Sequence, residues 1–290
     1  EVFGPGYAFV PREDLLTLEE IARIARVFTA IGMRKVRITG GEPLIRRNLE
    51  HLIEMIDAID GVEDISLTTN GSMLSPGRAV DLRKSGLKRL TISLDALDDP
   101  TFKRINDVDY PVSRVLDGIE HARAAGFSGT KINVVVRRGF NQHAVLDLVK
   151  HFRHTDCIVR FIEYMDVGET NGWNLDDVIP ASDLVDEIDA RYPLEAISQN
   201  YPGEVAKRWR YRDGAGEIGF ITSVTQSFCG ECSRARLSAV GQVYTCLFSS
   251  QGHDLRDLLR SGASDDQLLQ AVCDIWQGRN DRYSELRATA

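Results

Sequence analysis

The 290-residue sequence lacks any run of eighteen apolar residues, and its opening Glu-Val-Phe-Gly-Pro-Gly has neither the basic nor the apolar part of a signal peptide. We therefore expect neither a membrane span nor secretion. Cysteine is scarce: there are five, an odd number with three clustered, which does not suit a disulfide framework. These absences favour a protein of the reducing cytoplasm.

Positive charge is also in deficit, since 35 Lys and Arg stand against 43 Asp and Glu and leave a net charge of -8. A surface of that sign argues against general binding of nucleic acid. An anionic substrate would have to meet a local basic pocket. The length and a hydrophobic content of 43% are enough for a full core, in one large barrel or in a barrel with an appended domain.

Strand-like and helical segments alternate through the first half of the chain. Strands are predicted at five places: 35–39, 65–69, 89–94, 131–136 and 158–165. Alternation with helices predicts an α/β fold with a parallel sheet, in which polar residues at the carboxyl ends of the strands share one rim. Five or six units are too few for closure, so we expect an incomplete (β/α) TIM-like barrel over residues 1–167.

Two of the helices have testable details. Thr17 and Glu20 predict a capping box, and the first helix should turn four apolar residues inward, Leu18, Ile21, Ala25 and Phe28. Asn141 is expected to cap the helix that begins near residue 145. From about Gly168 the alternation stops, and a helix, a hairpin around 207–223 and a terminal helix from 264 predict a smaller α+β region over 168–290.

This second region carries a cysteine motif, Cys229-x-x-Cys232 with Cys246 further on. A Cys-x-x-Cys pair can bind one metal from a single tight turn, and a hairpin turn at Gly241 would return Cys246 towards the pair. Three thiolates leave one position on the metal. His253 would complete a closed zinc site, whereas an open position would suit an iron–sulfur cluster. The spacing alone does not choose between them.

Two arginines, Arg234 and Arg236, follow the second cysteine and would point to one face of a strand. Paired guanidinium groups suit phosphate, and we expect both to face the same cavity as Lys131. Arg160 could add to this pocket, but Glu163 lies close enough in sequence to pair with it. Arg160 is therefore left out of the predicted site.

Four motifs occur in a fixed order: Thr39-Gly40-Gly41-Glu42-Pro43, Thr68-Thr69-Asn70-Gly71, Ser93-Leu94-Asp95-Ala96, and Cys-x2-Cys-x13-Cys with Arg234-Ala235-Arg236. Together they resemble the GTP 3′,8-cyclase family, also called molybdenum-cofactor biosynthesis protein A, of radical S-adenosylmethionine enzymes. The resemblance covers essentially the whole chain. The family pattern also includes an N-terminal Cys-x3-Cys-x2-Cys and a C-terminal Gly-Gly tail, which these 290 residues do not contain.

The resemblance implies a lyase that cyclises GTP to 3′,8-cyclo-7,8-dihydroguanosine 5′-triphosphate, the first step of molybdenum cofactor (molybdopterin) biosynthesis. It implies two [4Fe-4S] clusters: the first reduces S-adenosylmethionine to a radical that takes the ribose 3′ hydrogen, and the second holds the guanine on its open iron. The second would be bound by Cys229, Cys232 and Cys246, with His253 left as a surface residue. No side chain is assigned as catalytic, because the cofactor carries the radical.

The same resemblance implies the binding residues. Contacts to S-adenosylmethionine fall at Gly41, where a side chain would block the approach, and at Ser93 and Met165. Contacts to GTP fall at six positions, Arg37, Thr68, Lys131, Arg234, Ala235 and Arg236.

Partners and rival functions complete the prediction. The expected partners are GTP, a cyclic pyranopterin monophosphate synthase that uses the product, and a second copy in a homodimer, with no nucleic acid and no membrane. A chain that began at Glu1 would be expected to bind GTP without cleaving S-adenosylmethionine, so a GTP-binding fragment without turnover is one alternative. A barrel lyase with a structural zinc is the other.

Overall fold

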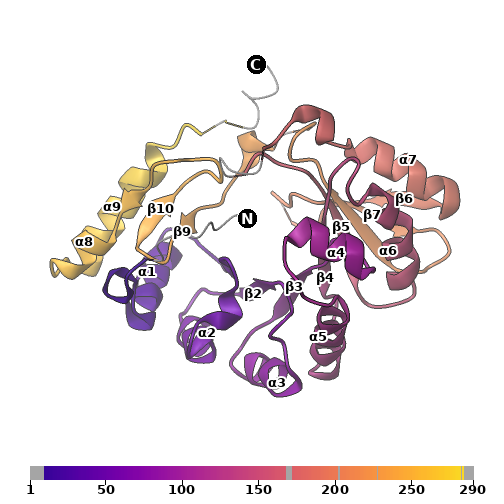
Figure 1. Ribbon diagram of the computed structural model, residues 1–290. Coiled ribbons are helices and arrows are strands. Elements are labelled where there is room, and N and C mark those ends of the chain that lie inside the picture. Colours follow the sequence, from indigo (N-terminus) through magenta and orange to yellow (C-terminus); the bar gives the residue numbers. More distant parts are fainter. Residues whose placement is uncertain (1–9, 168–171, 202, 227, 282, 284–290) are drawn as a thin grey trace.

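The computed structural model describes residues 10–167, 172–201, 203–226, 228–281 and 283. Its main feature is a curved eight-stranded sheet with helices along the outer side, and a small three-stranded sheet lies apart from it near α8 and α9 (Figure 1). The helices are α1 Leu18–Ala30, α2 Leu49–Asp57, α3 Pro76–Lys84, α4 Asp99–Asn106, α5 Ser113–Ala124, α6 Val145–Phe152, α7 Ala181–Arg191, α8 Arg256–Arg260 and α9 Asp265–Gln277. The strands are β1 Lys35–Ile38, β2 Asp64–Thr69, β3 Arg89–Ser93, β4 Lys131–Val136, β5 Ile158–Glu163, β6 Leu194–Ile197, β7 Lys207–Tyr211, β8 Glu217–Ile221, β9 Arg236–Leu237, β10 Gln242–Tyr244 and β11 His253–Asp254.

The large sheet has the order β1-β2-β3-β4-β5-β8-β7-β6. Neighbouring strands from β1 to β5 run parallel, β8 joins β5 in parallel, and β7 and β6 then pair antiparallel. In the part of the chain that is described, the edge strands β1 and β6 do not pair with each other. The α/β class and the parallel sheet are confirmed, and the open sheet is consistent with an incomplete barrel. The sheet is not confined to residues 1–167, since β6, β7 and β8 come later in the chain and belong to the same sheet.

The two faces of the sheet differ in chemistry because alternate residues of a strand point to opposite sides. One face is apolar: Ile65, Leu67, Ile92 and Val134 are among its fully buried members, and they pack against the covering helices. The strand register puts polar residues side by side on the other face: Arg37, Ser66, Thr68, Arg89, Thr91, Ser93, Lys131, Asn133 and Arg160. The inner face is therefore a polar and cationic surface.

Helix α1 begins with the predicted capping box, in which the Glu20 amide donates to Thr17 Oγ1 at 3.1 Å and the Thr17 amide donates to Glu20 at 2.8 Å. Of the predicted inward face, Leu18 and Ile21 do pack against the main core, but the fully buried residues of the helix are Ala22, Ile24 and Val27. The reason is a second core, formed by α1 with β10, α8 and α9. Helix α1 lies between two cores, so a single apolar stripe does not describe it.

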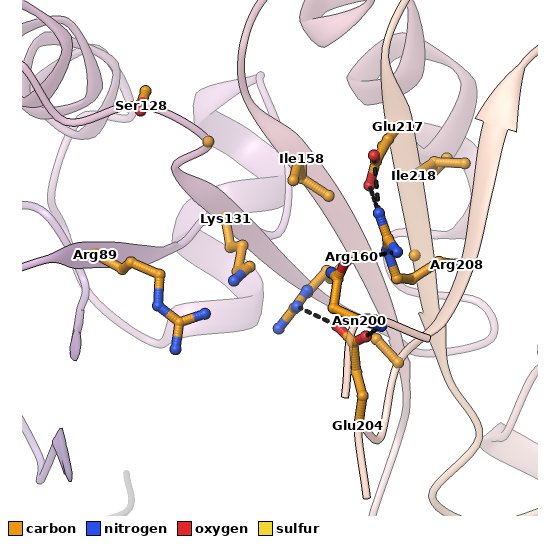
Figure 2. A pocket seen from close by; sticks show the side chains of 13 residues that line it. Arg89, Ser128, Lys131, Ile158, Arg160, Asn200, Glu204, Arg208, Glu217 and Ile218 are labelled. Atoms are coloured by element: carbon orange, nitrogen blue, oxygen red, sulfur yellow. Dashed lines mark hydrogen bonds and ion pairs between the residues drawn. The ribbon is translucent and has the colours of Figure 1, made fainter. Parts of the chain in front are cut away.

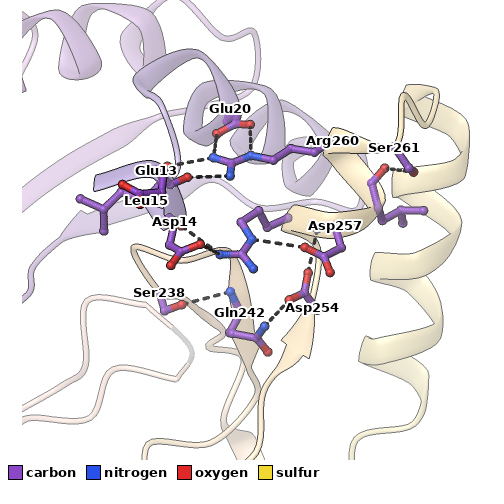
Figure 3. A network of polar contacts seen from close by, with 12 residues as sticks. Glu13, Asp14, Leu15, Glu20, Ser238, Gln242, Asp254, Asp257, Arg260 and Ser261 are labelled. Carbon is purple, nitrogen blue, oxygen red and sulfur yellow. Dashed lines mark hydrogen bonds and ion pairs between the residues drawn. The ribbon is translucent and has the colours of Figure 1, made fainter. Parts of the chain in front are cut away.

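Polar contacts join the segment before α1 to α8 (Figure 3). The Arg260 guanidinium donates to Glu20 at 2.9 Å and 3.1 Å and to the main-chain oxygens of Glu13 and Leu15 at 2.9 Å. Arg256 donates to Asp14 at 3.3 Å. These bonds fix the start of the described chain against the region that carries the cysteine motif.

Candidate functional site

The turn after β1 is held by Glu42. Its carboxylate accepts the Leu44 amide at 2.9 Å, the Thr69 hydroxyl at 2.7 Å and the Asn70 amide at 2.8 Å. The end of β1 is thus tied to the end of β2. A Cβ built on Gly41 would meet no atom of the described residues within 4 Å, so these residues do not require glycine there. Open space at this backbone position suits the close approach of a ligand.

Two further predicted residues lie at the same rim. Ser93 is the last residue of β3 and Met165 follows β5 by two residues, and both are half-buried. The carboxyl ends of parallel strands meet at one edge of a sheet, so Gly41, Ser93 and Met165 share this edge. The structure places these three positions at or just after the carboxyl ends of β1, β3 and β5, as the alternation of strands and helices predicts.

The predicted phosphate-binding cations lie deeper on the inner face. Lys131 begins β4 and lines a cavity of about 190 Å³, and its side chain points into the same space as those of Arg89 and Arg160 (Figure 2). Among the described residues, the side chains of Arg37 and Lys131 have no hydrogen bond or ion pair. Lys131 is half-buried, and a partly buried cation without an acid partner is costly to leave uncompensated, which indicates a site for an anion.

Each cation of this face makes it less favourable for its neighbours to stay charged. Burial, and after it the charges of Arg160, Arg89 and Arg37, lower the pKa of Lys131 to about 8, while Glu204 opposes them. Burial, followed by Arg37, likewise lowers the pKa of Arg160 to about 10. Arg37 keeps contact with solvent in the open interior, yet the surrounding protein still lowers its pKa.

Three residues of this face were missed by sequence reasoning. Arg160 belongs to the pocket, because its ion-pair partner is Glu204 at 3.7 Å and not Glu163. Arg89 lines the same cavity but is held by both oxygens of Asp64. Asn133, between Ser93 and Arg160 in the strand register, was not considered. The signal that would have found all three is the period-two pattern of polar residues along β3, β4 and β5.

Two buried polar atoms on the inner face have no hydrogen-bond partner in the described part of the chain, Thr68 Oγ1 and Asn133 Oδ1. An unsatisfied buried polar atom typically costs about 1–3 kcal/mol. Thr68 is a predicted GTP contact, and its register neighbour Thr91 in turn adjoins Lys131. The unpaired oxygens and the unpaired cations are therefore on one continuous surface.

The cysteine loop has the predicted hairpin. A 3-10 turn spans Cys229–Glu231, β9 and β10 pair antiparallel, and Gly241 takes a positive φ of 83° at the turn. Arg236 is close enough to Cys232 and Cys246 for both sulfurs to raise its pKa, although burial lowers that pKa overall. Arg236 therefore lies near two of the three cysteines, and its side chain has no hydrogen bond or ion pair among the described residues.

Cys232 is the best-defined sulfur of the three. Arg234 donates two N–H groups to its Sγ, each at 3.3 Å. Burial raises the pKa of this thiol, but hydrogen bonds from Arg279 and Arg234 outweigh burial and lower it overall. A thiolate is the form that binds metal, so the surroundings of Cys232 fit a metal ligand. Within the described residues, no three His, Cys, Asp or Glu side chains stand close enough together to hold a metal ion.

The expectation that Arg234 faces the cavity of Lys131 is wrong. Arg234 lines a second cavity, also of about 190 Å³, together with Cys232 and Phe228. The two cavities adjoin, since Glu204 lines both of them. Arg234 precedes β9, so the strand geometry on which the expectation relied begins only at Arg236.

The remaining candidates are His253 and Cys157. His253 is exposed on β11, where it pairs with Val243 of β10, and it does not take part in a metal-binding group in the described chain. Cys157 is buried, and burial raises the pKa of its thiol to about 11, as expected for a small core residue. All five cysteines are free.

Glu163, at the end of β5, anchors the segment that leads into the cysteine loop. Its carboxylate accepts the Val224 and Thr225 amides at 2.8 Å, the Thr225 hydroxyl at 2.6 Å and the Ala181 amide at 3.0 Å. The side chain is almost fully buried. This acid therefore fixes the start of α7 and the turn after β8 at the same time.

We expect Glu163→Gln to lower the free energy of unfolding by about 3 kcal/mol, because the new amide would face backbone N–H donors that only an acceptor can satisfy. Urea unfolding measures the change. Glu120→Gln is the control, since Glu120 is exposed and contacts Arg123 on the surface of α5. Equal stability of the Glu163→Gln protein and wild type would contradict the anchoring role.

Comparison with known proteins identifies the family to which this sequence is similar. Residues 5–152 match the Radical SAM superfamily, and residues 157–285 match Molybdenum Cofactor Synthesis C. The chain is 51% identical over 292 residues to GTP 3′,8-cyclase of Acidothermus cellulolyticus, which covers 99% of this chain and 80% of that protein. The chain belongs to the GTP 3′,8-cyclase family. It is also 50% identical over 277 residues to GTP 3′,8-cyclase of Xanthomonas axonopodis pv. citri, covering 96% of this chain and 82% of that protein.

Solved structures support the fold of this family member. Streptococcus suis SuiB aligns with a TM-score of 0.61 and 16% identity, over 87% of this chain and 60% of that protein. SuiB bound to S-adenosylmethionine aligns with a TM-score of 0.59 and 15% identity, over 91% of this chain and 61% of that protein. In the described residues, no helix is long and apolar enough to cross a membrane.

Proposed function

We propose that the chain catalyses the radical S-adenosylmethionine-dependent cyclisation of GTP to 3′,8-cyclo-7,8-dihydroguanosine 5′-triphosphate in molybdenum cofactor biosynthesis. The observation that carries the proposal is the inner face, where cations without acid partners lie between the strand rim and the cysteine loop. A triphosphate supplies the missing negative charge.

In this proposal each part of the inner face has one task. Gly41, Ser93 and Met165 bind S-adenosylmethionine at the rim, which places it above the open interior of the sheet. Thr68, Ala235 and the four cations Arg37, Lys131, Arg234 and Arg236 hold GTP. The protein fixes the two reactants relative to each other and keeps water away, and the radical itself is supplied by the cleaved S-adenosylmethionine.

We propose further that Cys229, Cys232 and Cys246 hold a [4Fe-4S] cluster whose fourth iron position receives the guanine. The lowered pKa of Cys232 and the position of Arg236 between two cysteines support this assignment. The exposure of His253 speaks against a closed zinc site. In this proposal, residues 1–167 bind S-adenosylmethionine and a first cluster, and residues 168–290 bind the second cluster and GTP.

Three parts of the proposal rest on the family alone. They are a homodimer, delivery of the product to a cyclic pyranopterin monophosphate synthase, and a cytoplasmic location. The last agrees with five free cysteines.

The pKa of Lys131 provides a test of the phosphate pocket. Phosphate favours the charged ammonium, and that charge is lost as the pH rises through about 8. We therefore expect GTP affinity to fall about fourfold between pH 7.0 and 8.5. In Lys131→Arg, which stays protonated, most of this fall should disappear, while any ionisation of GTP itself affects both proteins equally. Calorimetric titration at several pH values measures it, and identical pH profiles for the two proteins would contradict a phosphate at Lys131.

A further inference from the structure

The loop between β6 and β7 crosses the open interior of the sheet. β6 and β1 are opposite edges of the sheet, yet the ring of Tyr201 in this loop lies 3.3 Å from Lys35 Nζ on β1. The described residues of the loop, 198–201 and 203–206, include Asn200 and Glu204, which line the cavity of Lys131. The described part of the loop thus supplies part of the wall of the cationic pocket.

Glu204 is the acid that faces this pocket. One carboxylate oxygen accepts the Asn200 amide at 2.7 Å, and the other lies 3.7 Å from the Arg160 guanidinium, too far for a hydrogen bond. The side chain is 3% exposed. Arg160 reaches it across β8, where Gly219 leaves room: a Cβ there would lie 3.3 Å from Arg160 Cγ.

The other acids at the wall are already committed. Asp64 holds Arg89 with both oxygens, and Glu217 holds Arg208 at 2.7 Å and 2.9 Å. Figure 2 shows Arg208 and Glu217 on the wall of the same cavity as Lys131, paired with each other. Glu204 therefore carries the negative charge that Lys131 and Arg160 share, and it is the one acid acting on both of them among the described neighbours that set their pKa values.

Glu204 also lies where a bound nucleotide would have to pass. It lines both cavities, the one with Lys131 and the one with Cys232 and Arg234. A nucleotide with its base at the cysteines and its phosphates at Lys131 would extend past this carboxylate. Because it depends on that placement, the inference below rests on the proposed function.

We infer that Glu204 is the built-in counter-ion of the phosphate pocket and sets its affinity for polyphosphate. Without substrate, its charge offsets Lys131 and Arg160 and keeps the pocket from collecting small anions. When a triphosphate enters, phosphate oxygens replace Glu204 beside Arg160. The cost of parting Glu204 from Arg160, and the repulsion between carboxylate and phosphate, reduce the affinity, so both substrate and product can leave.

Glu204→Gln tests this directly. The glutamine oxygen can still accept the Asn200 amide, so the loop keeps its turn while the charge is lost. We expect the dissociation constants of GTP and of inorganic pyrophosphate to fall about tenfold each, equivalent to about 1.4 kcal/mol. Glu195→Gln, which removes one negative charge on β6 next to Arg210 and outside the pocket, should change neither. A purely structural role for Glu204 predicts the opposite sign, weaker binding, because Arg160 would lose its support.

The measurement is calorimetric titration of each protein with each ligand, with thermal unfolding as a check of folding. Unchanged or weaker binding of both ligands by a folded Glu204→Gln protein would overturn the inference. If that variant does not fold, Glu204→Asp withdraws the charge from Arg160 by one methylene, and we expect about threefold tighter binding. Unchanged or weaker binding by Glu204→Asp overturns the inference as well.

Lys131→Met separates the two proposals. If it does not weaken binding of either ligand, the proposed phosphate pocket is wrong. If Lys131→Met weakens binding but Glu204→Gln does not tighten it, only the counter-ion role of Glu204 is refuted.

Discussion

Replacing Cys246 with serine should remove the iron–sulfur cluster of the C-terminal region and abolish GTP cyclisation. Serine is a poor ligand for iron compared with a thiolate, and with three cysteines sharing one cluster there is no spare sulfur in the motif. We expect iron and sulfide bound by this region after anaerobic reconstitution to fall to background. The loss of the cluster removes the position proposed for guanine, so GTP affinity should fall with it.

Cys273→Ser is the matched control. Cys273 is a half-buried residue of α9 and is not part of the motif, so this protein should keep its iron. Iron and sulfide analysis, together with the visible absorption of the cluster, follows both proteins. One tightly bound zinc and no iron in wild type prepared without oxygen would replace the cluster by the zinc alternative.

Arg236→Ala should weaken GTP binding about ten- to a hundredfold while leaving the cluster in place. The guanidinium is half-buried, lies near Cys232 and Cys246, and has no hydrogen bond or ion pair within the described chain. A charge-assisted contact to the bound nucleotide contributes about 1.5–3 kcal/mol. Lysine should restore only part of the affinity, since an ammonium cannot reproduce the two parallel bonds of a guanidinium.

The competing explanation is that Arg236 stabilises the β9–β10 hairpin. It predicts less iron and a lower melting temperature, with GTP affinity unchanged per folded protein. Titration of GTP at matched iron content distinguishes the two, and Arg123→Ala, on the surface of α5, controls for the loss of one positive charge. Wild-type affinity in Arg236→Ala would defeat the assignment.

Local patterns predicted much of the fold because their physical causes are local. The capping box at Thr17 formed as expected, since it depends on residues three apart. β4 was predicted with its observed bounds from a β-branched run. Helix α4 was missed, although Asp98 followed two residues later by Pro100 is a pattern typical of a helix start. In the structure the Asp98 carboxylate accepts the Thr101 amide at 2.9 Å.

The errors arose where distant parts of the chain decide. Asn141 was expected to cap a helix, but its buried amide instead donates to the main-chain oxygens of Asp95 and Val135, at 2.9 Å and 2.8 Å, and joins the ends of β3 and β4. Glu163 was paired with Arg160 on sequence distance, yet the two residues are three apart on a strand and point to opposite faces. Arg160 pairs instead with Glu204, and Glu163 accepts from Ala181, Val224 and Thr225.

The candidate site likewise contains residues that the sequence could place and residues that it could not. Residues at strand ends, such as Gly41 and Ser93, could be placed from the alternation, because every parallel strand delivers its carboxyl end to one edge. Glu204 could not, because its contact with Arg160 depends on a loop that enters the sheet from its far edge. No periodicity in the sequence encodes that crossing.

The most direct test of the account is a crystal structure of the anaerobically reconstituted protein with GTP bound. The account predicts the guanine beside iron held by Cys229, Cys232 and Cys246, and the phosphates beside Lys131 and Arg160 with Glu204 displaced from the arginine. Phosphates bound elsewhere, with the cavity of Lys131 and Arg160 empty, would contradict it.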